Sequence, residues 1–264
     1  MSVPTAWYEV LMRVRPCQLT EVLKTCLHIR RRTASTLTNH TFCVDPVSVF
    51  GMHLLRDGIH EPQMTKLLFT LLRPSDTFLD VGGNEGYFSV IASTLVPEGA
   101  VHCIEPQGRL QTVLRRNFEL NGSTRAVAHR TALSNRHGTV SLFVRPSTNT
   151  GASSMFRHWK VGVATELVPC TTLDAFFESN GLNRVRLMKV DCEGAESLVI
   201  AGGRSVLNRG GIDFIAMDYH PTICGAARCK ATHAILSDAG YCLSQTDGLL
   251  VYHFPGFEND LRAR

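Results

Sequence analysis

The stretch Phe78-Leu79-Asp80-Val81-Gly82-Gly83-Asn84-Glu85-Gly86-Tyr87-Phe88 decides the fold of this chain. A short apolar run carries the carboxylate of Asp80, turns through three glycines and passes into an apolar segment, 87–95, that is typical of a helix. Strand, tight loop and helix N-terminus follow one another in this order at the nucleotide-binding crevices of α/β sheets. The stretch therefore predicts a ligand site at the carboxyl end of a sheet strand.

Two classes of cofactor compete for this loop. A dinucleotide site has the pattern Gly-x-Gly-x-x-Gly, whose middle glycine lets the backbone approach a pyrophosphate. Here Asn84 occupies the middle position, and the charge of Asp80 repels a pyrophosphate but attracts a cationic amino group. S-adenosylmethionine has such a group, so we expect it in preference to a dinucleotide or to a turn without a ligand. Glu105, after the apolar run 101–104, is placed to accept hydrogen bonds from the hydroxyls of a ribose and fits either cofactor.

Composition limits the class of protein. The chain has 264 residues, 44% of them hydrophobic and 19% charged, and a net charge of +4, too low to indicate a nucleic-acid partner without a concentrated patch. Its nine cysteines are scattered, without a Cys-x-x-Cys pattern, as expected for reduced thiols. No secretory signal and no apolar run of membrane-spanning length is recognisable. We therefore expect a cytoplasmic protein with neither a membrane nor a nucleic-acid partner.

Two regions differ in their patterns. Residues 1–65 predict one or two helices and then an extended segment at 42–44, and we interpret them as an N-terminal helical extension that covers one end of the sheet. Residues 66–264 are expected to form one globular unit. From Asp76 onward strands and helices alternate, which favours an α/β fold with a largely parallel sheet and helices on both faces.

The elements of this unit can be placed individually. We expect a helix over 110–120, a strand over 126–133, an added strand at 139–144, strands at 185–190 and 212–217, a helix near 226–239, and a terminal hairpin turning at Asp247-Gly248. Residues 146–165 predict a long loop of the kind that often serves as a lid. Its side chains with possible substrate contacts are Ser153, Ser154, Arg157, His158 and Trp159.

Acidic residues end four of the expected strands: Asp80, Glu105, Asp191 and Asp218. So many carboxylates at one edge of a sheet are unfavourable unless a cationic ligand, a base or a metal compensates them. Lys189 shares a strand face with Asp191, and a lysine buried within a sheet is expected to pair with an acid.

Three residues at this edge are the candidates for catalysis: Asp191, Glu193 and His220. The two acids can orient an acceptor, act as a general base or hold a divalent cation with Asp218; we rank the metal last and expect none. His220 is a candidate general base because the pKa of histidine lies near neutral pH. Glu61, before a predicted helix, either charges the first turn of that helix or reaches the amino group of the ligand.

At this point the chain resembles the FkbM family of S-adenosylmethionine-dependent methyltransferases. The similarity spans about 42–219 and is most specific in Lys189-Val190-Asp191-Cys192-Glu193-Gly194-Ala195-Glu196. It also includes Gly58-Ile59-His60-Glu61-Pro62, the loop 80–88, Glu105-Pro106, Arg116-Asn117, Leu120-Asn121-Gly122, Thr131-Ala132-Leu133-Ser134 and Thr172-Leu173-Asp174.

The resemblance implies a class I methyltransferase, a Rossmann-like fold whose seven-stranded sheet has its last strand antiparallel. It also implies a set of cofactor-binding residues: Asp80, Gly82, Asn84 and Gly86 around the methionine part, Glu105 on the ribose, and Ala132, Leu133 and Ser134 near the adenine. Usual acceptors are hydroxyls of small natural products or sugars. Two positions depart from the family, namely Gly83 in place of a common alanine and Asp218 in place of an expected glutamate.

The predicted function is O-methyl transfer to a hydroxyl of a small molecule. A non-catalytic module that binds an adenosyl ligand is the alternative from a different class, and a nicotinamide-dependent oxidoreductase is the enzymatic one. Methylation of nucleic acid is disfavoured, because Asp218-Tyr219-His220-Pro221 matches the signature of amino-group methylators poorly. The oligomeric state stays open, with a homodimer as one expectation.

Overall fold

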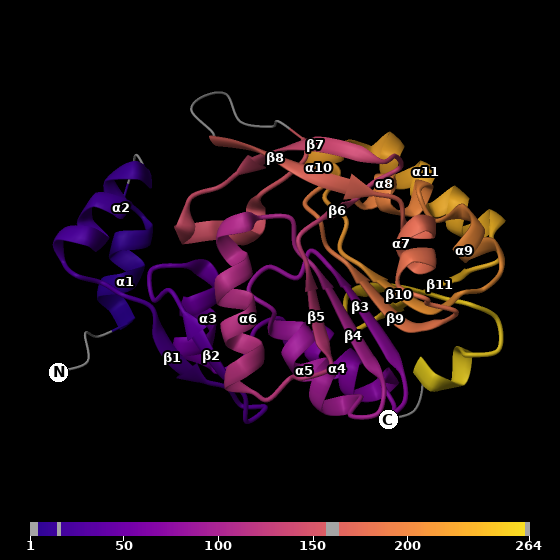
Figure 1. The fold of residues 1–264 in the computed structure, drawn as a ribbon, viewed down its shortest axis with the longest axis horizontal. Helices are drawn as coiled ribbons and strands as arrows, with labels where there is room; N and C mark the ends of the chain where they lie inside the picture. The colour runs from indigo at the N-terminus through magenta and orange to yellow at the C-terminus, as the bar shows by residue number, and fades with distance from the viewer. Residues whose placement is uncertain (1–4, 15–16, 157–163, 262–264) are drawn as a thin grey trace.

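The computed structural model describes residues 5–14, 17–156 and 164–261, and a seven-stranded sheet forms its centre (Figure 1). The strands run in the order β11-β12-β10-β9-β3-β4-β5. β12 is antiparallel to both of its neighbours, and the other pairings are parallel. Their bounds are β3 (Thr77–Val81), β4 (Ala100–Ile104), β5 (Ala126–His129), β9 (Val185–Val190), β10 (Ile212–Met217), β11 (Cys242–Thr246) and β12 (Leu249–His253). The expected sheet with an antiparallel last strand is confirmed.

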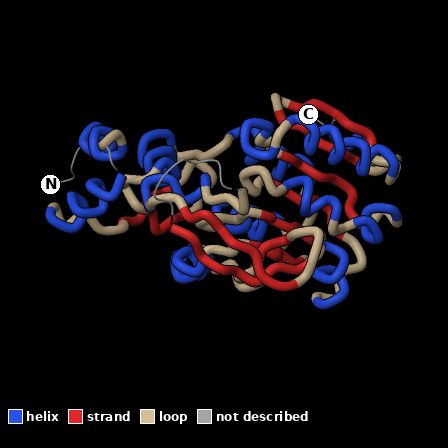
Figure 2. The backbone as a smooth tube through the Cα atoms, turned by 90° about the horizontal axis from the view of Figure 1, so that it is seen from above, coloured by secondary structure: helices blue, strands red, loops and turns tan. Residues whose placement is uncertain are grey.

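Helices cover both faces of this sheet (Figure 2). One face packs against α4 (Pro62–Leu71), α5 (Tyr87–Leu95) and α6 (Gln111–Leu120). The other packs against α7 (Leu173–Ser179), α8 (Glu196–Ala201), α9 (Arg204–Asn208) and α11 (Ala226–Asp238). Successive strand residues alternate between the two cores: Phe78 joins the first and Leu79 the second. Both faces are buried, which explains why most residues of the central strands are apolar.

The loop between β3 and α5 has little room for side chains. A Cβ atom on Gly82 would lie 1.9 Å from the backbone oxygen of Asp191, so this turn lies directly against the end of β9. Gly86 has a φ of +84° and precedes the first residue of α5, a conformation that favours glycine. The glycine spacing therefore sets both the close approach of two strand ends and the start of the helix.

A second, three-stranded sheet was only partly expected. It has the order β6-β8-β7, with β6 (Ala132–Leu133), β7 (Gly138–Val144) and β8 (Ala164–Thr171), and lies across the top of Figure 1. The expected single strand over 126–133 is wrong, because the chain leaves the main sheet after His129 and pairs again only with β8. The strand expected at 139–144 is present, but it belongs to this smaller sheet.

The N-terminal residues pack on the main domain through a short hairpin. After α1 (Thr5–Met12) and α2 (Cys17–Cys26), β1 (Arg32–Ser35) pairs with β2 (Thr41–Val44), and α3 (Val49–Asp57) follows. The two helices and the extended segment agree with the sequence pattern, whereas β1 was not expected. Asn117 of α6 accepts a 2.7 Å hydrogen bond from the backbone N–H of Cys43. Phe42 and Val44 are fully buried, so β2 extends the core.

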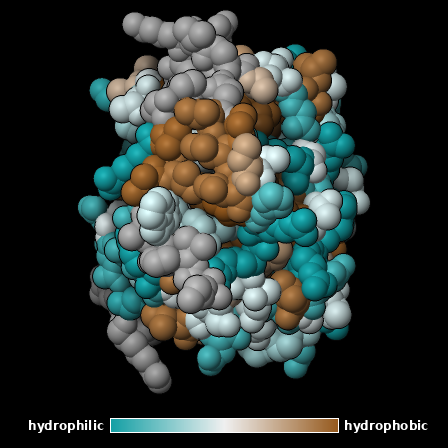
Figure 3. Space-filling model, turned by 90° about the vertical axis from the view of Figure 1, so that its left-hand side faces the viewer, coloured by the Kyte–Doolittle hydropathy of each residue, from teal (hydrophilic) through white to brown (hydrophobic). Residues whose placement is uncertain are grey.

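The outer side of this N-terminal part is partly apolar. Figure 3 shows a hydrophobic patch on the face that carries α1 and α2, and these helices expose large apolar side chains, among them Trp7, Val10, Leu19 and Val22. Within the described residues, no helix combines the length and the apolar character needed to cross a membrane.

Candidate functional site

A cavity opens at the carboxyl ends of β3, β4 and β9. It is bounded by the glycine loop, by the ends of these strands, by residues before α4 and by the segment between β7 and β8. Its lining includes Phe50, His60, Glu61, Gly82, Gly83, Asn84, Phe88, Glu105, Gln107, Ala132, Leu133, Thr150, Ser153, Met155, Lys189, Asp191 and Glu193. Of the candidate site residues, Asp80, Gly86, Ser134 and His220 lie outside this lining.

Glu105 occupies the position expected for a ribose-binding acid. Its two carboxylate oxygens accept the backbone N–H groups of Asn84, at 2.9 Å, and of Gln107, at 2.8 Å, and its side chain is almost entirely buried. Burial raises the pKa of Glu105 to about 7, although both hydrogen bonds oppose the rise. Each oxygen retains a lone pair, so the carboxylate can still accept the two hydroxyls of a ribose.

Apolar side chains bound the cavity near Glu105. Ala132 and Leu133 line it together with Val81, Ile104 and Pro106, and this environment suits a flat base. Ala132 and Leu133, two of the residues expected near the adenine, are thus both on the cavity surface. Ser134 is buried just outside it, where its backbone oxygen lies 2.1 Å from the Cβ position of Gly202.

Asp80 lies behind the glycine loop and not on the cavity surface. It is fully buried, accepts a 2.7 Å hydrogen bond from Ser89 Oγ and faces Lys189 Nζ at 3.9 Å. Burial raises the pKa of Asp80, and the ammonium of Lys189 opposes this effect. The direct contact with a cationic ligand that the sequence suggested is thus not provided here. Asp80 instead faces Lys189, which does line the cavity.

Lys189 links this buried acid to the cavity. Its ammonium lies 3.1 Å from Asp191 Oδ2 and 5.2 Å from the centroid of the Phe88 ring. The pairing of Lys189 with neighbouring acids, predicted from its place in the strand, is confirmed. Because Lys189 and Asp191 both line the cavity, the ion pair also fixes a carboxylate at its edge.

Gly83 explains one departure from the family pattern. A Cβ atom at this position would lie 2.1 Å from Cys103 Sγ on the neighbouring strand β4. Cys103 is completely buried and cannot move aside without repacking. Glycine therefore replaces the common alanine here because the thiol of Cys103 fills the space that the methyl group would occupy.

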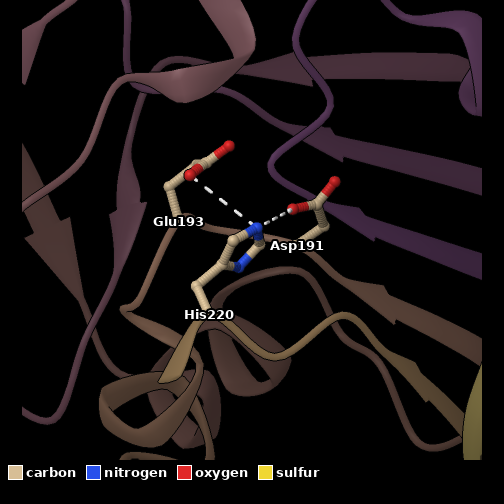
Figure 4. Close-up of side chains that lie close together, drawn as sticks. All are labelled: Asp191, Glu193 and His220. Atoms are coloured by element: carbon tan, nitrogen blue, oxygen red, sulfur yellow. Dashed lines mark ion pairs between the residues drawn. The ribbon is translucent and has the colours of Figure 1, made fainter. Parts of the chain in front are cut away.

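The three candidate catalytic side chains come together beyond the ends of β9 and β10 (Figure 4), and two of them, Asp191 and Glu193, line the cavity. Asp191 and Glu193 follow β9, and His220 follows β10. His220 Nε2 lies 3.7 Å from Glu193 Oε2 and 3.9 Å from Asp191 Oδ1. Asp218 approaches the same nitrogen at 3.9 Å, but its side chain is 65% exposed.

The surroundings of His220 do not favour a general base. Burial alone lowers the pKa of His220, but the hydrogen bond to Glu196 and the charges of Glu193 and Asp191 outweigh it and raise the pKa to about 9. The imidazole therefore holds its proton at neutral pH in this arrangement. Burial raises the pKa of Glu193 to about 7, with the charge of His220 opposing and that of Asp191 adding to the rise. Of the two, Glu193 is the better proton acceptor.

Residues that precede the seven-stranded sheet in the sequence also line the cavity. Glu61 lines it as expected, next to His60, whose Nε2 lies 3.2 Å from Glu61 Oε1. Phe50, from α3, adds an aromatic side chain. His60 stands in the stretch Gly58 to Pro62 that carries the family resemblance, and this was the available signal for its position. Nothing in the local pattern of α3 indicated that Phe50 faces a ligand site.

The segment η2 (Ser147–Ala152), a 3₁₀ helix, lies within the stretch 146–165 for which a lid is predicted, and Asn149, Thr150 and Gly151 line the cavity. Thr150 donates a 2.9 Å hydrogen bond to Asn84 Oδ1, and its backbone oxygen accepts from Gln107 Nε2 at 3.1 Å. Ser153 lines the cavity, whereas Ser154 is buried and donates to the backbone oxygen of Glu193 at 2.6 Å. The other expected lid contacts, Arg157, His158 and Trp159, lie outside the described residues.

These residues fit S-adenosylmethionine from one end of the cavity to the other. Glu105 supplies the acceptor for a ribose, Ala132 and Leu133 the walls for a base, and the loop 82–86 a backbone without side chains at its closest approach. Glu61, on the cavity wall, supplies a negative charge that can attract a cationic amino acid group.

Comparison with known proteins agrees with this assignment. The model of the methyltransferase FkbM domain matches residues 80–243, more than half of the chain. "Methyltransferase 1" of Beauveria bassiana is 28% identical over 148 residues, which are 49% of this chain and 59% of that protein. The 2-O-methyltransferase NoeI of Sinorhizobium fredii is 25% identical over 176 residues, 58% of this chain and 70% of NoeI. The chain thus spans less than two thirds of the first of these relatives.

Solved structures are more distant. A putative methyltransferase from Streptococcus mutans in complex with SAH is 10% identical, with a TM-score of 0.46, and the match covers 74% of this chain and 98% of that one. A TM-score below 0.5 is too low to support a family assignment, so the assignment depends on the matched domain and on the geometry of the cavity. The chain belongs to the FkbM family of S-adenosylmethionine-dependent methyltransferases.

Proposed function

We propose that this protein transfers a methyl group from S-adenosylmethionine to a hydroxyl oxygen of a small molecule. One observation carries the proposal: the cavity joins a cofactor end, at Glu105, to an end lined by the carboxylates of Asp191 and Glu193. Carboxylates accept hydrogen bonds from hydroxyls and can take their protons. The name of NoeI, a 2-O-methyltransferase, supports an oxygen acceptor.

A few cavity residues each have a defined part in this reaction. When bound, S-adenosylmethionine supplies an electrophilic methyl group on a sulfonium. Glu105 holds the ribose hydroxyls, and Lys189 keeps Asp191 in place through their 3.1 Å contact. Asp191 orients the acceptor hydroxyl, and the carboxylate of Glu193 accepts its proton, since burial raises the pKa of Glu193 to about 7. Phe50 and Met155 bound the acceptor on its apolar side.

We further propose that residues 66–264 form the methyltransferase unit and that residues 1–65 cap it. The cap contributes Val49, Phe50, His60 and Glu61 to the cavity. The choice of acceptor then depends partly on the N-terminal residues.

A transfer assay tests this function. S-adenosylmethionine with a deuterated methyl group is incubated with the full chain and a panel of sugars, phenols and hydroxylated natural products, and mass spectrometry detects labelled methyl ethers. Glu193→Gln should lower the rate by roughly 10²–10⁴-fold if Glu193 takes the proton. Glu119→Gln makes the same change at an exposed surface acid and should leave the rate unchanged.

One result would correct the assignment of the proton acceptor, and another would reject the proposed function. Full turnover by Glu193→Gln would remove Glu193 from the reaction. Tight binding of S-adenosylhomocysteine without transfer to any hydroxyl on the panel would favour the non-catalytic module instead.

A further inference from the structure

The cluster of Asp191, Glu193 and His220 has the composition of a metal site. Each residue offers one ligand atom, and these atoms all lie within 4.8 Å of one another. Figure 4 shows the three side chains pointing toward a common point. We propose that they bind one divalent metal cation at the acceptor end of the cavity. The role of this cation toward the acceptor rests on the proposed function, whereas its binding does not.

The imidazole of His220 is held in the orientation that a metal ligand requires. Nδ1 donates a 3.1 Å hydrogen bond to Oε1 of Glu196, which is completely buried. The same oxygen accepts the backbone N–H groups of Cys192, at 3.2 Å, and Gly194, at 3.0 Å, so Glu196 cannot swing away freely. This bond turns Nε2 toward the two carboxylates, where a bound cation would replace the proton on that nitrogen. Metal-ligating histidines commonly have such a carboxylate on their other nitrogen.

The distances within the cluster suit a shared ion better than direct hydrogen bonds. Glu193 Oε2 and Asp191 Oδ1 lie 3.7 and 3.9 Å from His220 Nε2, beyond hydrogen-bond length. Two ligands that each lie about 2.0–2.2 Å from one ion are separated by roughly 3–4 Å. Lys189 contacts the other oxygen of Asp191, Oδ2, and leaves Oδ1 for the ion. The competing arrangement is a protonated His220 that forms three long ion pairs.

The ligand set selects the kind of cation and its use. One imidazole with two carboxylates favours Mn²⁺, Fe²⁺ or Zn²⁺ over the soft Cu(I). Three protein ligands leave coordination positions open toward the cavity, since Asp191 and Glu193 line it. A hydroxyl bound there loses its proton more easily. An acceptor with two adjacent oxygens, such as a vicinal diol or a hydroxy acid, can occupy two of these positions.

Direct titration tests the site without reference to turnover. Metal-stripped full-length protein is titrated with Mn²⁺, and electron paramagnetic resonance measures the free ion. We expect one site whose affinity falls at least roughly tenfold in Glu193→Gln and in His220→Ala, because each loses one ligand. Asp191→Asn is the isosteric variant that keeps the fold if His220→Ala does not. Glu119→Gln should bind Mn²⁺ like the unchanged protein, since Glu119 lies on the surface of α6.

Calorimetry with S-adenosylhomocysteine on the same samples separates the two proposals. Binding of S-adenosylhomocysteine without binding of Mn²⁺ would overturn the metal site and leave the proposed function intact. Mn²⁺ binding that persists unchanged in Glu193→Gln and Asp191→Asn would place the ion elsewhere and also overturn it. A third outcome is that the unchanged protein binds Mn²⁺, that these variants lose this binding, and that no sample binds S-adenosylhomocysteine. It would support the metal site and reject the proposed function.

Discussion

At the scale of single residues, Glu105 makes cofactor binding depend on pH. Burial raises its pKa to about 7, and only the ionised carboxylate can accept hydrogen bonds at both oxygens from a ribose while it still accepts from Asn84 and Gln107. The cofactor therefore binds the deprotonated form. Affinity should rise with pH up to about 7 and then level off. Between pH 8 and pH 6 we expect about a tenfold loss in the affinity for S-adenosylhomocysteine, measured by calorimetry.

Glu105→Gln provides the control for this prediction. Glutamine has nearly the same shape but does not titrate, so its weaker binding should be almost independent of pH over this range. An equal pH slope in the variant would show that another group controls the effect. In the free protein the sign is opposite, because a carboxyl with a raised pKa makes folding less favourable as pH rises through about 7. Cofactor binding and stability thus respond to pH in opposite directions through one side chain.

At the scale of elements, Asp174 of α7 shows how a motif of the family can be structural. Its two carboxylate oxygens accept the backbone N–H groups of Ser205, at 3.1 Å, and Val206, at 2.8 Å, in the first turn of α9. Asp174 therefore caps a helix that lies about thirty residues further along the chain. Asp174→Ala should lower the free energy of unfolding, measured with urea, by about 1–2 kcal/mol and leave the affinity for S-adenosylhomocysteine unchanged. A large loss of affinity at unchanged stability would contradict this structural role.

Elements whose pattern is local and strong were predictable from the sequence. β3, β4, β9 and β10 are mostly apolar because helices bury both of their faces. The turn Asp247-Gly248 was equally clear, and both residues adopt the positive φ values that a two-residue hairpin needs. The carboxyl ends of parallel strands meet at one edge, so the position of Glu105 and Asp191 followed directly.

Elements that depend on distant partners were not predictable. β8 contains Pro169, which argues against a strand, and its Leu167 is exposed, so the pattern of burial is irregular. β8 nevertheless forms, because β7 pairs with it along its whole length. The same reason applies to the site: the depth of Asp80 and the charge of His220 arise from side chains on other elements, which no local spacing reveals.

At the scale of the whole molecule, the N-terminal residues hold the segment that closes the cavity. Lys24 of α2 donates a 2.6 Å hydrogen bond to Ser147, the first residue of η2, and pairs with the buried carboxylate of Asp45. Glu21, one turn earlier on α2, accepts a hydrogen bond from the same Ser147 hydroxyl. Thr150, three residues further along η2, contacts Asn84 in the glycine loop. A continuous chain of contacts thus connects α2 to the cofactor end of the cavity.

Lys24→Met should therefore weaken ligand binding from a distance. Methionine keeps the apolar length of the side chain but removes both contacts, which leaves Asp45 without its buried cation. We expect the free energy of unfolding to fall by about 1–3 kcal/mol. If η2 then closes in a smaller fraction of molecules, the affinity for S-adenosylhomocysteine should fall on the order of threefold. The reason is that the apparent affinity scales with the fraction of molecules in the binding-competent conformation.

Lys66→Met separates this effect from a general loss of charge. Lys66 forms an exposed ion pair with Asp247, at 2.8 Å, and lines no part of the cavity. An exposed ion pair contributes little to stability, so the free energy of unfolding of this variant should fall by no more than about 1 kcal/mol. The variant should bind S-adenosylhomocysteine normally. Equal affinity in Lys24→Met and Lys66→Met, with only the former less stable, would show that the N-terminal residues stabilise the fold without shaping the site. A selective loss of affinity in Lys24→Met would make α2 part of the binding apparatus, although it lies far from Glu105 in the sequence.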